Sequence, residues 1–259
     1  MQDLRVSLVQ SMLHWEDASA NRTHFAKRLE PLAGRTDLVV LPEMFSTGFT
    51  MRSRELAETM DGPTVQWMQA QAKVIDAALY GSLIINDAGT FTNRGLFVRP
   101  DGSITCYDKR HLFRMANEHD HYAPGQERVV TDWRGWRILL QVCYDLRFPV
   151  FSRNRNDYDL ALYVANWPEA RRYPWSQLLV ALAIENLAYV VGVNRVGMDG
   201  KGIHYSGDSV ALDHLGASVT DIEASQESVS TAVLAAGALD EHRKRFPAFL
   251  DADGFDLRS

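Results

Sequence analysis

The thiol of Cys143 stands at a position where a cysteine could act as a nucleophile. Residues 138–142 form a short apolar run that is typical of a buried strand. A polar cluster at residues 145–147 follows at once, so the chain must turn at the cysteine. Such a turn exposes the sulfur beside backbone N–H groups, which can stabilise a thiolate or a developing oxyanion. Taken alone, the local context favours the alternative that Cys143 is one more small, buried apolar residue.

Two further ionisable residues also follow predicted strands. Glu43 comes directly after the strand at residues 37–42, and the ends of parallel strands are where α/β sheets place their sites. A solvent-facing or capping carboxylate is an equally good interpretation of Glu43. Lys109 follows the predicted strand at residues 103–107, and its local context indicates an ordinary surface charge.

The elements that must position these residues alternate between strands and helices. Branched and apolar runs predict strands, and three- and four-residue apolar spacings predict helices. The order is β-α-β-α-β-β-β followed by β-α-β-β-β, which indicates two similar halves within one α/β domain spanning residues 1–259. The predicted strands are residues 4–10, 37–42, 79–85, 91–99, 103–107, 136–142, 158–165, 189–195, 206–213, 216–220 and 230–234. The predicted helices are residues 18–32, 64–78, 175–187 and 240–250.

Two segments lie outside this pattern. Residues 114–128 are polar and too long for a tight turn, and long ordered loops in compact domains tend to be functional. Residues 251–259 form a tail that is either disordered or docked elsewhere on the protein.

Composition excludes several classes of protein. Of the 259 residues, 46% are hydrophobic and 23% are charged, and the net charge of −6 gives no attraction for nucleic acid or an anionic membrane. No apolar run reaches the roughly 20 residues of a membrane span, and the start of the chain does not resemble a signal peptide. Two cysteines, Cys106 and Cys143, make no disulfide framework, so we expect a cytoplasmic protein. No zinc-ligand spacing, GxGxxG or P-loop is present, so we expect neither a metal nor a cofactor.

Three separated motifs together resemble the nitrilase superfamily of carbon–nitrogen hydrolases. They are Leu41-Pro42-Glu43, the segment Tyr107-Asp108-Lys109-Arg110-His111-Leu112-Phe113, and the segment Val142-Cys143-Tyr144-Asp145-Leu146-Arg147-Phe148-Pro149. The one departure is Val142, where isoleucine is commoner. The resemblance covers essentially the whole chain and implies a four-layer α-β-β-α sandwich. It also implies a Glu43-Lys109-Cys143 triad without a metal, and a homodimer.

The triad that the resemblance implies fits the chemistry of amide hydrolysis. Cys143 would form a thioester, and Glu43 would take the thiol proton and deliver a proton to the leaving ammonia. Lys109 would hold the oxyanion with the Tyr144 N–H and favour the thiolate. The resemblance also assigns an auxiliary role to Glu118, for which the alternative is a surface loop carboxylate.

The surroundings of the triad carry weaker predictions. Four aromatic residues adjoin the motifs and are expected to line a substrate pocket, although ordinary core packing explains them equally well: Phe45, Phe113, Tyr144 and Trp167. His111 is expected to be a hydrogen-bonded core histidine. Arg114, Arg171 and Arg172 are the candidates for binding a substrate carboxylate.

Within the superfamily, the chain most resembles the bacterial ω-amidases. Residues 45–49 and 141–149 carry this likeness. It implies hydrolysis of a short ω-amide of an α-keto acid, such as 2-oxoglutaramate, with release of ammonia. The alternatives are a nitrilase or an N-carbamoyl amide hydrolase of the same superfamily, and a catalytically silent, nitrilase-like binding module.

Overall fold

The larger of two main sheets has six strands in the order β13-β1-β2-β3-β4-β5. The protein is described by a computed structural model over residues 1–257. Strands β1, β2 and β3 run parallel, whereas β13, β4 and β5 each pair antiparallel to a neighbour. The strand bounds are β1 Leu4–Gln10, β2 Leu38–Val40, β3 Ala78–Asp87, β4 Thr90–Val98, β5 Ile104–Asp108 and β13 Ser228–Leu234. Strand β13 therefore brings the end of the chain back beside its beginning.

The second sheet has five strands in the order β12-β9-β8-β7-β6. Its three central strands are parallel, and an antiparallel strand closes each edge. The bounds are β6 Val130–Trp133, β7 Trp136–Val142, β8 Leu160–Ala165, β9 Tyr189–Asn194 and β12 Val210–Leu212. A separate two-stranded ribbon consists of β10 (Val196–Met198) and β11 (His204–Ser206).

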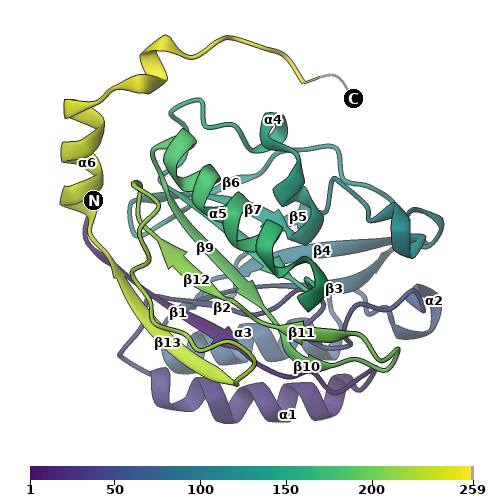
Figure 1. Ribbon diagram of the computed structural model, residues 1–259. Helices are drawn as coiled ribbons and strands as arrows, with labels where there is room; N and C mark the ends of the chain where they lie inside the picture. The colour runs from purple at the N-terminus through teal and green to yellow at the C-terminus, as the bar shows by residue number, and fades with distance from the viewer. Residues whose placement is uncertain (258–259) are drawn as a thin grey trace.

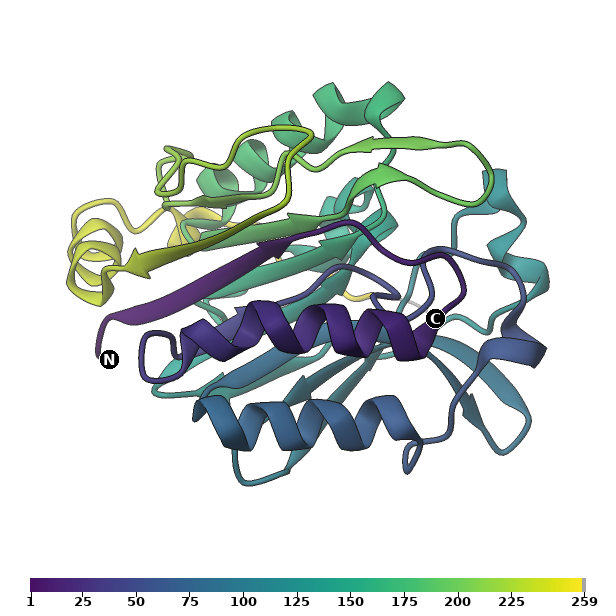
Figure 2. The same cartoon turned by 90° about the horizontal axis from the view of Figure 1, so that it is seen from below.

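Helices cover the outer face of each sheet. Helices α1 (Ala18–Leu29) and α3 (Pro63–Ile75) lie side by side against the first sheet, and α5 (Arg172–Asn186) covers the second (Figures 1 and 2). The remaining helices are α2 (Ser53–Leu56), α4 (Pro149–Ser152) and α6 (Ala236–Arg245). The predicted α-β-β-α sandwich is confirmed. Among residues 1–257, no helix has the length and apolar character that crossing a bilayer requires.

The alternation of strand side chains builds two hydrophobic layers. In β2, Leu38 and Val40 belong to the cluster between the two sheets. Val39 points the other way and packs in the cluster that contains Phe25 and Leu29 of α1. Since successive strand side chains face opposite sides of a sheet, a fully apolar strand such as β2 can bury both its faces.

The sequence predictions fail mainly near the C-terminus. The predicted strand 206–213 is interrupted because Gly207 and Asp208 both have positive φ, so that β11 and β12 are separate strands. Residues 216–220 form only an isolated bridge at Ser218. The last α-helix covers Ala236–Arg245 rather than residues 240–250. Pro247 follows this helix, and a proline cannot continue a helix.

Other differences are smaller. The predicted strand pattern contained neither β6 nor β10, and the loop at 114–128 contains two short 3₁₀ turns. Of the predicted tail, residues 252–257 have no regular structure, and the Phe255 ring lies 4.6 Å from the Arg155 guanidinium. Residues 258–259 of that tail lie outside the described part of the chain.

Candidate active site

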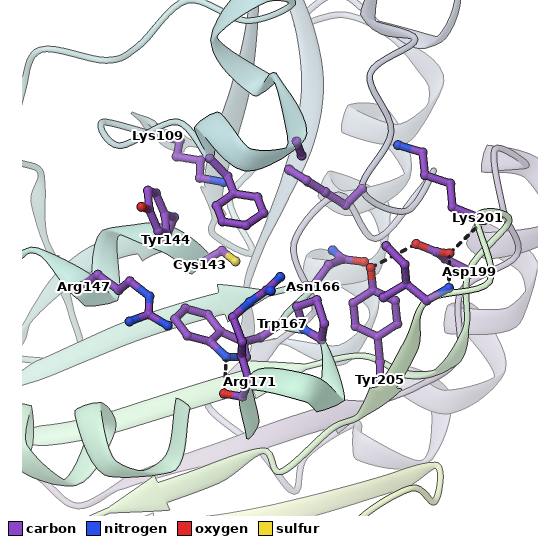
Figure 3. Close-up of a pocket in the computed structure, with 15 residues that line it drawn as sticks. Lys109, Cys143, Tyr144, Arg147, Asn166, Trp167, Arg171, Asp199, Lys201 and Tyr205 are labelled. Carbon is purple, nitrogen blue, oxygen red and sulfur yellow. Dashed lines mark hydrogen bonds between the residues drawn. The ribbon is translucent and has the colours of Figure 1, made fainter. Parts of the chain in front are cut away.

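The three motif residues come together from three different strand ends. Glu43 follows β2, Lys109 follows β5 and Cys143 follows β7. The Nζ atom of Lys109 lies 2.9 Å from Oε1 of Glu43. Lys109 and Cys143 line one cavity, into which the Cys143 sulfur points (Figure 3). The structure thus brings a thiol, a carboxylate and an ammonium into one small site.

The backbone turns sharply at Cys143. Its φ angle of 48° lies in the left-handed region, between the last residue of β7 and a 3₁₀ turn at Cys143–Arg147. A non-glycine residue in that conformation costs about 1–2 kcal/mol. The turn directs the sulfur into the cavity, as the change from an apolar run to a polar cluster predicted. Cys143 is nevertheless buried, with 9% of its surface exposed, which corrects the expectation of an exposed sulfur.

Two asparagines hold the carboxylate of Glu43. Asn93 of β4 donates from Nδ2 to Oε1 at 2.8 Å. The main-chain N–H of Asn166 donates to Oε2 at 2.8 Å, and its Nδ2 donates to the main-chain oxygen of Glu43 at 2.6 Å. Glu43 is fully buried, so these donors replace the water that a carboxylate otherwise requires. The orientation of Glu43 is therefore fixed by residues from both sheets.

Lys109 and Glu118 are buried, which corrects the expectation of surface charges that their local sequence gave. Both side chains are 0% exposed, and Lys109 Nζ lies 3.0 Å from each carboxylate oxygen of Glu118. Burial lowers the pKa of Lys109, but the charges of Glu118 and Glu43 raise it by more, so the ammonium stays protonated. Burial raises the pKa of Glu118, Lys109 opposes that rise, and Glu43 adds to it. The ammonium is thus clamped between two carboxylates.

The Cys143 thiol is protonated in the resting site. Burial raises the pKa of Cys143 well above its ordinary value, and the adjacent Glu43 charge raises it further. The Lys109 charge lowers that pKa, as expected from the sequence, but does not outweigh the other two. A reaction at this sulfur would therefore need a base to remove the thiol proton at the moment of attack.

The cavity has a volume of about 80 Å³, and several aromatic residues stand in its wall. Of the four predicted aromatic residues, Phe113, Tyr144 and Trp167 line it. Phe45 does not, because it packs in the core against Phe25 and Trp67. Its place in the wall is taken by Phe49, whose ring centroid lies 5.2 Å from Lys109 Nζ.

Two arginines stand at the cavity wall. Arg171 was among the predicted carboxylate ligands and lies over the Phe113 ring at 5.3 Å. Arg147 belongs to the third motif but was not predicted to bind substrate; it lies over the Trp167 ring at 5.1 Å. Arg172 is paired instead with Asp208 at 2.5 Å. Arg114 faces a neighbouring depression outside the cavity.

The remaining wall comes from the ribbon of β10 and β11. Asp199, Lys201 and Ile203, in the turn between β10 and β11, line the cavity together with Tyr205 of β11. Figure 3 labels Asp199, Lys201 and Tyr205 at this wall. The Tyr205 hydroxyl donates to Oδ2 of Asp199 at 3.0 Å. This wall was not predicted from the sequence, in which no strand and no site residue was expected between residues 195 and 206. Across residues 1–257, no three His, Cys, Asp or Glu side chains are grouped so as to hold a metal ion.

The chain belongs to the carbon–nitrogen hydrolase family. The family pattern, Carbon-nitrogen hydrolase, matches residues 5–244. Over nearly the full length, the sequence is 51% identical to the ω-amidase YafV of Escherichia coli K12 and 53% identical to the ω-amidase YafV of Yersinia enterocolitica, covering 99% of this chain and 100% of each relative. The crystal structure of XC1258 from Xanthomonas campestris, a CN-hydrolase superfamily protein, superposes with a TM-score of 0.98 at 53% identity over 100% of both chains. The resemblance read from the three motifs is confirmed.

Proposed function

We propose that this protein is a cysteine-dependent ω-amidase that hydrolyses the terminal amide of a short α-keto acid to the acid and ammonia. The observation that carries the proposal is the buried arrangement of Glu43, Lys109 and Glu118 beside the Cys143 thiol, with arginines at the wall of the same cavity. The 51–53% identity to ω-amidases over 99% of the chain supports this substrate class.

In the first half of the reaction, Glu43 accepts the proton of Cys143 as the sulfur attacks the amide carbon. Lys109 Nζ and the N–H of Tyr144 stabilise the resulting oxyanion, and the loss of one such donor typically costs about 3–4 kcal/mol. The tetrahedral intermediate collapses as protonated Glu43 returns its proton to the nitrogen. The carbon–nitrogen bond breaks, ammonia leaves and a thioester remains.

The second half consumes one water molecule. Glu43, again a carboxylate, removes a proton from water, and the hydroxide attacks the thioester carbon. The same two donors hold the second oxyanion. The carbon–sulfur bond breaks, the sulfur takes the proton back from Glu43, and the carboxylic acid leaves. Throughout both halves, Glu118 holds Lys109 in place and does not exchange protons with the substrate.

The cavity wall carries arginines that can bind the far carboxylate of the keto acid. Arg147 and Arg171 both line the cavity, and their guanidinium groups are packed on aromatic rings rather than paired with an acid within the described chain. A guanidinium suits a carboxylate because it offers two parallel N–H donors. This assignment replaces Arg172, which is already paired with Asp208, and leaves Arg114 outside the site.

Assembly, compartment and domain organisation complete the proposal. Apolar residues remain exposed on and beside α5: Tyr173 is 73%, Ile184 48% and Leu215 61% exposed. Such a patch is typical of an interface, and we infer a homodimer formed through this face.

The two free cysteines favour a reducing cytoplasm. The pairing of β13 with β1 supports one domain over residues 1–259.

The proposal is tested by measuring ammonia release from 2-oxoglutaramate with the wild type and Cys143→Ala. A nitrile and an N-carbamoyl amino acid serve as comparison substrates. Release from the ω-amide alone, abolished by Cys143→Ala, supports the proposal. Release mainly from the nitrile or the carbamoyl compound would move the protein to another branch of the family. Equal activity in both proteins would exclude Cys143 as the nucleophile.

A further inference from the structure

A buried carboxylate behind the site ties two catalytic segments together. Asp145 is 0% exposed and does not line the cavity. Its Oδ2 accepts hydrogen bonds from the Val142 N–H at 3.0 Å and from the Tyr107 hydroxyl at 2.7 Å. Its Oδ1 accepts from the His111 N–H at 3.0 Å and lies 2.8 Å from Nδ1 of the His111 ring.

These partners lie next to, or two residues from, Cys143 and Lys109, the two residues whose separation the reaction depends on. Val142 directly precedes Cys143, and Tyr107 and His111 lie two residues to either side of Lys109. One carboxylate therefore spans the junction between the left-handed turn after β7 and the segment after β5. Such a group restrains both the direction of the sulfur and the path of the Lys109 backbone.

We propose that Asp145 is a positioning residue, which holds the Cys143 sulfur and the Lys109 ammonium at their working separation. This inference rests on the proposed function, since it assigns Lys109 the task of holding the oxyanion at the carbon that Cys143 attacks. Asp145 touches neither the substrate space nor the reacting atoms, and acts only through the residues it binds.

A carboxylate is required because two of the contacts come from main-chain N–H groups, which can only donate, and the Tyr107 hydroxyl and the Nδ1-protonated tautomer of His111 donate as well. An ionised carboxylate offers only acceptors. An asparagine would present an N–H₂ group to either the Val142 or the His111 main-chain N–H, and a main-chain N–H cannot become an acceptor. One bonded pair would thus become repulsive, and the turn would shift. A displacement of about 1 Å between reacting groups can cost about 100-fold in rate.

His111 offers a second way to weaken the same device. Its ring stacks on Phe148, with centroids 3.8 Å apart and planes at 7°, which holds Nδ1 towards Asp145. In His111→Asn, a side-chain N–H can reach the place of Nδ1, whereas His111→Ala has no donor. We therefore expect His111→Asn to retain most of the activity that His111→Ala loses.

The principal test compares Asp145→Asn with a matched control, Asp159→Asn. Asp159 is also a buried aspartate, 4% exposed, but it precedes β8 and binds Arg137 and Arg243 rather than the site. We expect Asp145→Asn to lower kcat on 2-oxoglutaramate about 100-fold with KM changed less than about threefold. Iodoacetamide labelling of Cys143 should slow as well. Asp159→Asn should lower thermal stability and leave kcat and the labelling rate near the wild-type values.

The labelling rate keeps this inference separate from the choice of substrate. If the wild type does not hydrolyse the ω-amide, the proposed function fails, and the labelling rates of Asp145→Asn and Asp159→Asn still decide the role of Asp145. A folded Asp145→Asn protein with wild-type kcat and labelling would overturn it. If Asp145→Asn does not fold, the His111 variants decide the role of Asp145. Equal labelling rates in His111→Ala and the wild type would overturn that role, whereas a loss of labelling in His111→Ala that His111→Asn restores would support it.

Discussion

Replacing Glu118 by glutamine removes one negative charge from the site while keeping the length of the side chain. In the structure, both carboxylate oxygens of Glu118 lie 3.0 Å from Lys109 Nζ, and Oε2 also accepts the Phe113 N–H at 2.5 Å. A glutamine of the same length must turn its N–H₂ group towards at least one of these donors. The Lys109 ammonium then keeps only Glu43 as an anionic partner.

The expected loss follows from the geometry. Two unit charges 3.0 Å apart attract by about 5–6 kcal/mol at an effective dielectric constant of about 20. Because Glu43 remains 2.9 Å from Lys109, we expect about half of that energy to appear as lost transition-state stabilisation. A loss of about 3 kcal/mol corresponds to a kcat about 150-fold lower. KM should change little, because Glu118 does not line the cavity.

A second readout should move in the opposite direction. The Glu118 charge raises the pKa of Cys143, so removing it should lower that pKa and speed iodoacetamide labelling at a fixed pH. Hydrolysis slows while alkylation accelerates, a pair of effects that general loss of structure does not produce. The assays are steady-state ammonia release and the labelling rate, with Glu127→Gln as the control, since Glu127 is exposed in the same loop. A kcat within about threefold of the wild type would refute the assignment of Glu118.

Three further outcomes are expected. In Glu43→Gln, the Cys143 thiol must ionise unaided, and burial still raises its pKa, so labelling should rise about tenfold per pH unit around neutral pH, far more steeply than in the wild type; parallel pH profiles would contradict a base role for Glu43. In Gly125→Ala, the added methyl would overlap the Asp108 carbonyl, so we expect about 3 kcal/mol of destabilisation by urea unfolding together with a lower kcat; wild-type stability would contradict the tight approach. Burial raises the pKa of Asp159, but its two arginine partners lower it by more, so its stabilising effect is present above about pH 4 and is lost as the pH falls through the lowered native pKa. Asp159→Asn should therefore flatten the acid limb of a plot of thermal midpoint against pH, and an unchanged limb would contradict this.

Much of the fold was predictable because its strands are buried on both faces. The apolar runs that became β8 and β9 have little polar character to obscure them. Short strands in the second half of the chain were harder to predict. Strands β11 and β12 have three residues each, and Gly207 and Asp208, which have positive φ, separate them. Three residues carry too little periodicity to distinguish a strand from a turn.

The site was predictable from its motifs but not from its local chemistry. Lys109 and Glu118 look like surface charges in their own segments, and only the folded chain buries them against each other. Asn93 and Asn166 have no distinguishing sequence context, yet they orient Glu43 from two different sheets. Arg147 lies inside a recognised motif, and its place at the cavity wall depends on how Trp167 packs beneath it.

The position of β13 has a consequence for synthesis of the chain. Leu4 to Gln10 pair with Leu234 to Ser228, so one edge of β1 has no partner until almost the whole polypeptide has been made. Contacts between such distant residues slow folding, and an unpaired edge strand is a template for association with other chains. The nascent protein thus depends on late closure of the sheet. A chain shortened before residue 228 would leave that edge open permanently, and we expect such a product to aggregate rather than to accumulate as a smaller folded protein.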